Sequence, residues 1–597
     1  LGPRTLTATS GGQIVQLNVQ QAVAGVPVRG AFLSAVVNHG NLVLMGSRNW
    51  GAVAVSTTPA LGRDAAVAAA ESYVGRSFSD YWSAPHLELV PVSTADDPSA
   101  IPVGSGLGHR LVWAIGPHFA DDHGTWEVLV DARSGEIVAF TDTNHYATKA
   151  VRGGVLPLSN DGHGVEGQEQ AGYPMPFADV TTDAGELLFT DSGGDVSCSA
   201  AGTGIRTRLD GRYVRISDAC GAIDEHAADP DDLDLGASAG TDCAVPPGSD
   251  SPGNTHSART GFYEVNRIKE IARGWLPENE WLEAQITANM NIPETCNAFW
   301  NGSTINFYAS GGGCRNTGEI AAVFDHEWGH GMDDNDANPS ISAPGEAYAD
   351  VASILRLNES CVGRGFDADD VPCGGNGDRC TVCTGVREVD WAKRASAQPH
   401  DLDWINSPTF VAPGGCVGGI FIPTQQGPCG QGTHCEGSVA SEAVWDLFKR
   451  DLPAFAGAGF GIDDATAQEL VTRLYYLGGG ALGNWYNCNP VAPPGLRGDG
   501  CNADGAYLNF LAIDDDNGDL GDGTPHMPAV FAAFDRHQMA CPTPAPVAAA
   551  SCTRPTAAPD LTVTPSHKGA ELSWAAVPGA TKYWVFRGDG VLACSFG

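Results

Sequence analysis

The uneven distribution of cysteine is the feature that most limits how this chain of 597 residues can fold. Residues 1–197 contain no cysteine, whereas fifteen of the 17 cysteines lie between Cys198 and Cys541. Many thiols in an acidic, loop-rich chain favour disulfides that form outside the cytosol. We therefore expect a secreted, extracellular protein in which a cysteine-free part precedes a disulfide-bonded part.

A metal cluster is the alternative interpretation of these cysteines. Only Cys380 and Cys383 have the short spacing that is typical of zinc ligands, and the intervals to Cys361 and Cys373 upstream are irregular. We therefore favour disulfides for these four residues, with a zinc knuckle as the alternative. The pairing of the cysteines does not follow from the sequence.

The charge of the chain excludes two classes of partner. It has 33 basic and 71 acidic residues, a formal net charge of −38. Nucleic acids and anionic membranes both attract basic surfaces. No run of about 18 apolar residues occurs, which a membrane-spanning helix would require. We expect no nucleic-acid partner and no membrane span.

Hydrophobic patterning divides the chain into five parts. Residues 1–146 are predicted to form two small α+β units, with a helix at 63–74 and strands at 14–19, 26–38, 42–46, 110–115, 125–130 and 136–140. Residues 147–253 are predicted to be rich in short strands, and residues 254–541 to be mainly helical, with helices at 260–272, 438–450, 465–477 and 527–537. A Pro/Ala-rich linker, 542–559, precedes a strand-like tail, 560–597, that is too short for a complete sandwich domain.

One short motif of the second part is discounted. Residues 236–240 (GASAG) match the G-x-S-x-G elbow of serine hydrolases. That elbow must follow a buried apolar strand and begin a helix, whereas a polar stretch precedes this copy. We predict a loop here and no nucleophile.

The motif that carries chemistry lies at residues 326–330 (HEWGH). On a helix, His326 and His330 are one turn apart on the same face, so both imidazoles can bind one Zn²⁺. Glu327 stands beside the first histidine, where it can hydrogen-bond a water at the metal without binding the metal itself. The segment predicts one catalytic zinc ion.

A third ligand is needed because a catalytic zinc has three protein ligands and one open position. Glu346, sixteen residues after His330, lies four residues before Asp350 in the segment GEAYAD. On a helix these two carboxylates share a face, so Glu346 can bind the metal while Asp350 accepts the free ring N–H of a ligating histidine. Asp336 is the competing ligand, but that arrangement requires a glycine where Asp333 stands. We predict Glu346.

The two motifs resemble those of the gluzincin metalloendopeptidases, the thermolysin and fungalysin families, and GEAYAD is nearer to the fungalysin form. Residues 297–302 (NAFWNG) are similar to the edge strand of thermolysin-like enzymes. The resemblance implies an α+β, two-lobed fold, with a β-rich N-terminal lobe, a helical C-terminal lobe and the active-site helix between them. It also implies protein or peptide substrates, whose backbone would pair with Asn297 and Ala298.

The same resemblance implies two further site residues. His434, in the segment THCEG, would donate to the tetrahedral intermediate, and Arg387 would bind the substrate carbonyl. The chain departs from the thermolysin pattern in two places. No tyrosine occurs in residues 331–345 between the zinc motifs, and Cys429 replaces the aspartate that orients the histidine. Oxyanion support is therefore expected from His434 or from a tyrosine elsewhere in the chain.

The N-terminal part is similar to the propeptides of the same families. Residues 25–46 resemble their propeptide signature, and residues 125–138 resemble the PepSY-type module that follows it. The resemblance implies a prosegment, residues 1–146, that acts as a chaperone and intramolecular inhibitor and is removed by cleavage within 143–153. The tail, 560–597, resembles a truncated fibronectin type III module.

An acidic loop near the end of the helical part offers hard oxygen ligands. Asp515, Asn517 and Asp519 stand at alternate positions, a spacing that suits Ca²⁺. The glutamate at the twelfth position of an EF-hand is missing. The loop is either a calcium site or a solvated acidic turn.

The resulting hypothesis is a secreted zinc metalloendopeptidase in zymogen form. Its general base is Glu327, a role worth about 10²–10⁴-fold in rate. Two alternatives remain: a zinc exopeptidase on the same scaffold, and a catalytically inactive adhesin. An exopeptidase needs a group that binds a free chain end, and no such motif is visible. An adhesin has no use for Glu327 beside a metal.

Overall fold

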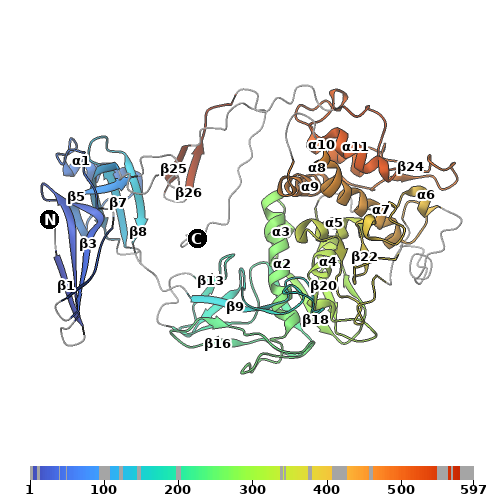
Figure 1. The fold of residues 1–597 in the computed structure, drawn as a ribbon, viewed down its shortest axis with the longest axis horizontal. Helices are drawn as coiled ribbons and strands as arrows, with labels where there is room; N and C mark the ends of the chain where they lie inside the picture. The colour runs from blue at the N-terminus through green and yellow to red at the C-terminus, as the bar shows by residue number, and fades with distance from the viewer. Residues whose placement is uncertain are drawn as a thin grey trace. The chain divides into compact units, whose positions relative to one another are not determined.

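A computed structural model describes most of the chain. The described residues are 4–9, 14–38, 41–48, 50–92, 108–119, 125–143, 149–196, 203–336, 341, 344–373, 379–406, 427–455, 462–547, 562–566 and 569–577. They form a mixed α/β structure with several sheets and helices (Figure 1). No helix of the described part is long and apolar enough to cross a membrane.

The chain divides into two compact units, each of which is described by itself. The first comprises Leu1–His145, Thr556–Pro578 and Phe596–Gly597. The second comprises Tyr146–Pro555 and Gly579–Ser595.

The N-terminal residues form one eight-stranded sheet, where the sequence predicted two small units. The order is β1-β2-β3-β5-β6-β7-β8, with β4 also paired to β3. A single pair, Val28 with Leu89, connects β3 to β5 and so joins the two halves. The strands are β1 Arg4–Thr9, β2 Ile14–Val23, β3 Val26–Asn38, β4 Asn41–Arg48, β5 Tyr81–Val92, β6 Gly108–Pro117, β7 Trp126–Asp131 and β8 Ile137–Asp142.

One helix packs against this sheet. In α1 (Arg63–Val74), the buried residues Ala66, Ala70 and Val74 are spaced by four and therefore share one face. They pack in a cluster with Trp126 and other apolar residues of the sheet. The helix ends at Gly75, whose φ of 72° lies in the left-handed region that favours glycine.

The second unit begins with short strands, as its sequence predicted. In one of its sheets, β15, β18 and β20 are parallel neighbours, and β19 pairs antiparallel with β20 at the edge. The strands of this unit are β9 Lys149–Val155, β10 Gln170–Pro174, β11 Asp179–Thr182, β12 Leu187–Phe189, β13 Asp195–Val196, β14 Ile205–Thr207, β15 Val214–Asp218, β16 Glu225–Ala227, β17 Leu233–Asp234, β18 Ile286–Ile292, β19 Ala298–Trp300, β20 Thr304–Tyr308, β21 Cys361–Val362, β22 Arg387–Glu388, β23 Asn487–Cys488 and β24 Gly498–Asp499.

Helices dominate the rest of the second unit. They are α2 His256–Trp275, α3 Glu280–Glu283, α4 Ala321–Asp333, α5 Gly345–Leu357, α6 Leu402–Ile405, α7 Thr433–Asp446, α8 Leu452–Ala454, α9 Asp464–Gly479, α10 Ala506–Asp514 and α11 Met527–Arg536. Short 3₁₀ turns occupy Thr317–Glu319, Trp391–Lys393 and Leu520–Asp522, and a π-helical turn, Leu447–Asp451, follows α7.

Helices α4 and α5 pack closely against each other (Figure 1). They come close together at Gly329, where an added Cβ would lie 2.7 Å from the Cα atom of Ala349. Only glycine therefore allows this separation. The two helices carry the two zinc motifs of the sequence, so this contact brings the motifs together.

In the C-terminal tail, the structure describes one hairpin, formed by β25 (Thr562–Ser566) and β26 (Gly569–Ser573). The rest of the predicted fibronectin-like module lies outside the described residues, as do most of the predicted linker and part of the predicted cleavage window.

Candidate metal centre

Three donor groups converge between α4 and α5. The Nε2 atoms of His326 and His330 are 3.2 Å apart. Glu346 Oε2 lies 3.2 Å from His326 Nε2, and Glu346 Oε1 lies 3.8 Å from His330 Nε2. One ligand atom from each residue thus falls within 4.8 Å of the others. The spacing of four residues on α4 brings the two histidines together, and the packing of α5 against α4 brings Glu346 to them.

Asp350 fixes the orientation of the first histidine. Its Oδ1 atom lies 2.9 Å from His326 Nδ1. A carboxylate can only accept a hydrogen bond, so Nδ1 carries the proton and the lone pair of Nε2 points to the other donors. Asp350 is fully buried and also accepts from Arg387, through Nε at 2.8 Å and Nη2 at 2.6 Å.

The buried charges of the cluster perturb its histidines in opposite directions. Burial lowers the pKa of His326, but hydrogen bonds and charges from Asp350 and Glu346 outweigh it and raise the pKa to about 10. Burial lowers the pKa of His330 to about 4. One histidine is therefore drawn towards its charged form by the carboxylates, while the other stays neutral. Two carboxylates at this point favour a cation.

The donor set fits a divalent metal such as Zn²⁺. Two imidazole nitrogens and one carboxylate are the ligand types of catalytic zinc sites. Glu346 Oε2 is buried, and its nearest neighbours are His326 Nε2 at 3.2 Å and Arg387 Nη2 at 3.6 Å. When Asp350 holds the His326 proton at Nδ1, Nε2 gives this oxygen no hydrogen bond. A buried carboxylate oxygen without a donor is costly unless a cation or donor meets it. His326, His330 and Glu346 could therefore hold the metal.

Glu327 lies beside this point. Its side chain is buried, and it lines the same cleft as the three donors. Burial raises the pKa of Glu327 to about 7, and the charge of His326 opposes the rise. The carboxyl is therefore balanced between its two protonation states near neutral pH.

An open cleft of about 680 Å³ contains the site. One side is formed by β19 and the residue before it, Asn297, which the sequence predicted to bind substrate backbone. Since β19 pairs only with β20 among the described strands, its outer edge is unpaired. An apolar part of the lining, which the sequence did not single out, is formed by Val323, Val362, Gly363, Phe366 and Val386.

His434 enters the site from a third helix. It lies in the first turn of α7, and its Nε2 atom is 3.2 Å from Glu346 Oε1. The charge of Glu346 raises the pKa of His434, but burial and the charges of Arg387 and His326 outweigh it, so the pKa is lowered. The side chain of His434 is only partly buried, and its neutral imidazole can donate one N–H into the cleft.

Arg387 lies in the cleft but is also paired. Two of its nitrogens bind Asp350, while the third, Nη1, has no hydrogen-bond partner among the described residues. The guanidinium therefore fixes Asp350 and retains donors for a further group. The sequence predicted the second function and not the first, because the pairing depends on residues 37 positions apart.

Neither the alternative metal ligand, Asp336, nor a tyrosine that could stabilise the oxyanion lines the described part of the cleft. Asp336 accepts a hydrogen bond of 2.9 Å from the Tyr348 hydroxyl, and that tyrosine is fully buried. No tyrosine is among the described residues that line the cleft. Glu436 does not orient His434 but accepts from the amides of Cys429 and Gln431.

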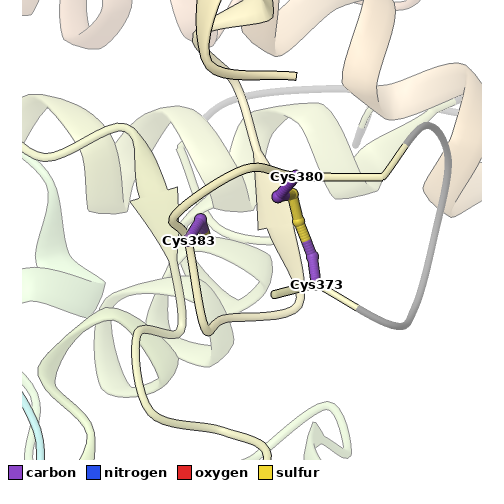
Figure 2. Close-up of side chains that lie close together, drawn as sticks. All are labelled: Cys373, Cys380 and Cys383. Carbon is purple, nitrogen blue, oxygen red and sulfur yellow. A yellow bond between two sulfur atoms is a disulfide. The ribbon is translucent and has the colours of Figure 1, made fainter. Parts of the chain in front are cut away.

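The candidate zinc knuckle is a pair of disulfides. Cys361 is bonded to Cys383, and Cys373 is bonded to Cys380. Figure 2 shows the second bond, with Cys383 beside it. Disulfide sulfurs carry no thiolate, so these residues are not metal ligands. The other described disulfides are Cys220–Cys243, Cys296–Cys314, Cys429–Cys488 and Cys501–Cys541.

The predicted calcium loop bonds mainly to itself. Asp515 accepts from the amides of Asn517 and Gly518, Asn517 accepts from Asp519, and Asp519 accepts from Gly521. These short-range bonds stabilise the turn without a cation. Calcium binding at Asp515, Asn517 and Asp519 stays a prediction.

Ser238, in the discounted GASAG segment, lies in a loop beside a histidine. Its Oγ atom is 3.2 Å from His256 Nε2 and accepts a hydrogen bond of 3.0 Å from Arg259, which also binds Glu169. Glu169 also lies 3.4 Å from His256 Nδ1. A nucleophile elbow begins a helix, whereas no helix follows Ser238 until α2 starts at His256. The cluster instead ties the loop to the first turns of α2.

Among known proteins, similarity to this chain is found in solved structures. No protein-family model and no curated protein matches this chain. Twenty-four chains of solved structures match, among them the precursor of protealysin, a metalloproteinase from Serratia proteamaculans. That match has 14% sequence identity and a TM-score of 0.31, and covers 54% of this chain and 86% of the other. At this TM-score the similarity does not establish function, which rests on the site residues themselves.

Proposed function

We propose that this chain is a secreted zinc-dependent metalloendopeptidase that hydrolyses peptide bonds of proteins. The observation that carries the proposal is the convergence of His326, His330 and Glu346 in an open cleft, with Glu327 beside them. A purely structural metal site is closed by four protein ligands, whereas this set has three. The remaining position is open to the cleft.

Zn²⁺ bound by these three side chains would polarise a substrate carbonyl and lower the pKa of an attacking water towards ~7. The protein residues do the rest. Glu327 takes the proton of the water and passes it to the amine that leaves, so one proton moves from water to product nitrogen. Glu327 is buried and lines the same cleft as the three donors, so its carboxyl lies where both transfers take place.

Three further residues prepare the site. Asp350 holds His326 in the tautomer that presents Nε2. His434 and Arg387 supply N–H donors at the cleft for the oxygen that becomes negative during attack. Because no tyrosine of the described cleft can share this task, His434 and Arg387 are the proposed oxyanion donors.

An extended substrate would bind along β19. The unpaired edge of this strand offers backbone N–H and C=O groups next to Asn297 and Ala298. Strand addition uses only backbone groups and therefore accepts many sequences, which suits an enzyme that cuts within proteins. An exopeptidase would also need a group that fixes a chain end.

Residues 1–146 are the proposed prosegment, removed by a cut within residues 143–153 before the enzyme acts. The disulfides of the second unit support folding in an oxidising compartment. Ca²⁺ at the loop 514–523 is a further proposal.

The test uses the purified full chain after maturation. Metal analysis should give about one zinc per chain, and the enzyme should cleave both casein and a peptide blocked at both ends. Glu327→Gln should keep the zinc and lose cleavage by about 10²–10⁴-fold. The matched control, Glu469→Gln on the exposed face of α9, should change neither. Absence of zinc, or full turnover by Glu327→Gln, would contradict the proposal.

A further inference from the structure

A short two-stranded ribbon forms one wall of the cleft. Strands β21 and β22 pair antiparallel, Cys361 with Glu388 and Val362 with Arg387. Beyond the pairs, the Val386 amide donates to Val362 O at 2.9 Å and the Val389 amide donates to Ser360 O at 3.0 Å. A ladder this short is marginal by itself. A covalent connection between its two strands would therefore stabilise it.

The ribbon contacts both the cleft and the metal ligands. Val362, Gly363 and Val386 line the cleft. Arg387, on the second strand, binds both oxygens of Asp350, which in turn orients His326. A shift of one strand would therefore move a cleft wall and pull on the group that orients a metal ligand.

Two disulfides close the segment between the strands, one inside the other. Cys361–Cys383 joins the first strand to the residues just before the second, with a sequence separation of 22. Cys373–Cys380 joins two cysteines within that loop, with a sequence separation of 7 (Figure 2). Neither Cys373 nor Cys380 lines the cleft, whereas Cys361 directly precedes Val362, which does.

We propose that the Cys361–Cys383 disulfide is a positioning element of the active site, which keeps the ribbon closed and so holds Arg387 and the apolar wall in place. The cystine touches no substrate and acts through the ribbon. Cys373–Cys380 stabilises the outer loop without this effect. The inference rests on the proposed peptidase function.

The test compares two double variants of the full chain, Cys361→Ala with Cys383→Ala and, as matched control, Cys373→Ala with Cys380→Ala. Zinc content should stay at one per chain in both, because the ligands are on α4 and α5. Activity is measured well below the melting temperature and is expressed per zinc-bound molecule. The value of kcat/KM should fall tenfold or more in the variant without Cys361–Cys383, and should stay within threefold of the wild type in the variant without Cys373–Cys380. Loss of stability alone would not produce this difference.

Hydrogen exchange gives a readout that needs no activity. The Val386 amide should exchange slowly in the wild type and in the control, and rapidly without Cys361–Cys383. Unchanged exchange at Val386, or equal losses of kcat/KM in the two variants, would overturn the inference. If the wild type binds zinc but cleaves no peptide, the proposed peptidase function is wrong. Hydrogen exchange at the Val386 amide then tests by itself whether the Cys361–Cys383 disulfide keeps the ribbon closed.

A third variant covers failure of the first to fold. A Cβ at Gly385 would lie 2.3 Å from Val362 O. Gly385→Ala therefore forces the two strands of the ribbon apart while every cysteine remains. It should reproduce the loss of kcat/KM with zinc retained. Wild-type kcat/KM in Gly385→Ala would refute the positioning role of the ribbon.

Discussion

Gly329→Ala should weaken metal binding although alanine is the better helix former. An added Cβ would lie 2.7 Å from the Ala349 Cα atom and 3.3 Å from the Ala352 Cβ atom. Carbon atoms in contact prefer about 3.5–4.0 Å, so α4 and α5 must separate by about 1 Å. Metal–ligand distances tolerate only about ±0.2 Å. Because His326 and His330 are on one helix and Glu346 is on the other, the separation acts directly on the ligand set.

The free energies indicate a variant that folds. Replacing a helical glycine by alanine gains about 1 kcal/mol of helix propensity, while overpacking costs about 1–3 kcal/mol. The net loss of stability is therefore at most about 2 kcal/mol. Displaced ligands should weaken zinc affinity on the order of 10–100-fold, the scale of effects seen when groups around a metal are perturbed.

The assay is competition for zinc against a chromogenic chelator, with peptidase activity measured at rising zinc. The control is Gly274→Ala in α2, where an added Cβ meets nothing within 4 Å. It should leave zinc affinity unchanged and stabilise the chain slightly. If Gly329→Ala binds zinc within twofold of the wild type, the link between helix separation and metal binding is wrong.

Three other outcomes follow from the buried groups. Burial raises the pKa of Glu319 to about 7, so the folded chain keeps a proton that the unfolded chain releases above about pH 4.5. Stability should therefore fall as pH rises through about 4.5–7, by a few kcal/mol, and a plot of melting temperature against pH should be flatter for Glu319→Gln. Asp350→Asn removes the negative charge that Arg387 binds. It should lower zinc affinity, measured by titration with zinc, or kcat/KM, measured at saturating zinc, by about 10–100-fold. Removal of metal with a chelator should lower the melting temperature and abolish cleavage, and added Zn²⁺ should restore both. A chelator-resistant activity would exclude a metal mechanism.

The sequence predicted those features that depend on local periodicity. Spacings of four residues placed His326 near His330, and Glu346 near Asp350, because a helix fixes such neighbours whatever surrounds it. The alternating residues of 26–38 likewise predicted β3. Strand β5 was missed because Pro85 and Pro91 interrupt its pattern.

Contacts between distant segments were beyond the sequence. The bonds from Arg387 to Asp350, the partner of each cysteine and the apolar wall of the cleft all depend on tertiary packing. The joining of the N-terminal strands into one sheet depends on a single pair, Val28 with Leu89, which no periodicity reveals. The start of α7 was also missed, since a glycine, Gly437, directly follows its first turn.

Two parts of the cleft lining differ in what they can distinguish. The edge of β19 presents main-chain groups, which are the same in every polypeptide. Discrimination between substrates must therefore come from the apolar part, where Val323, Phe366 and Val386 line the cleft. Redesign of selectivity should begin at Phe366 and Val386, because changes there would alter which bonds are cut while the general grip on an extended chain persists.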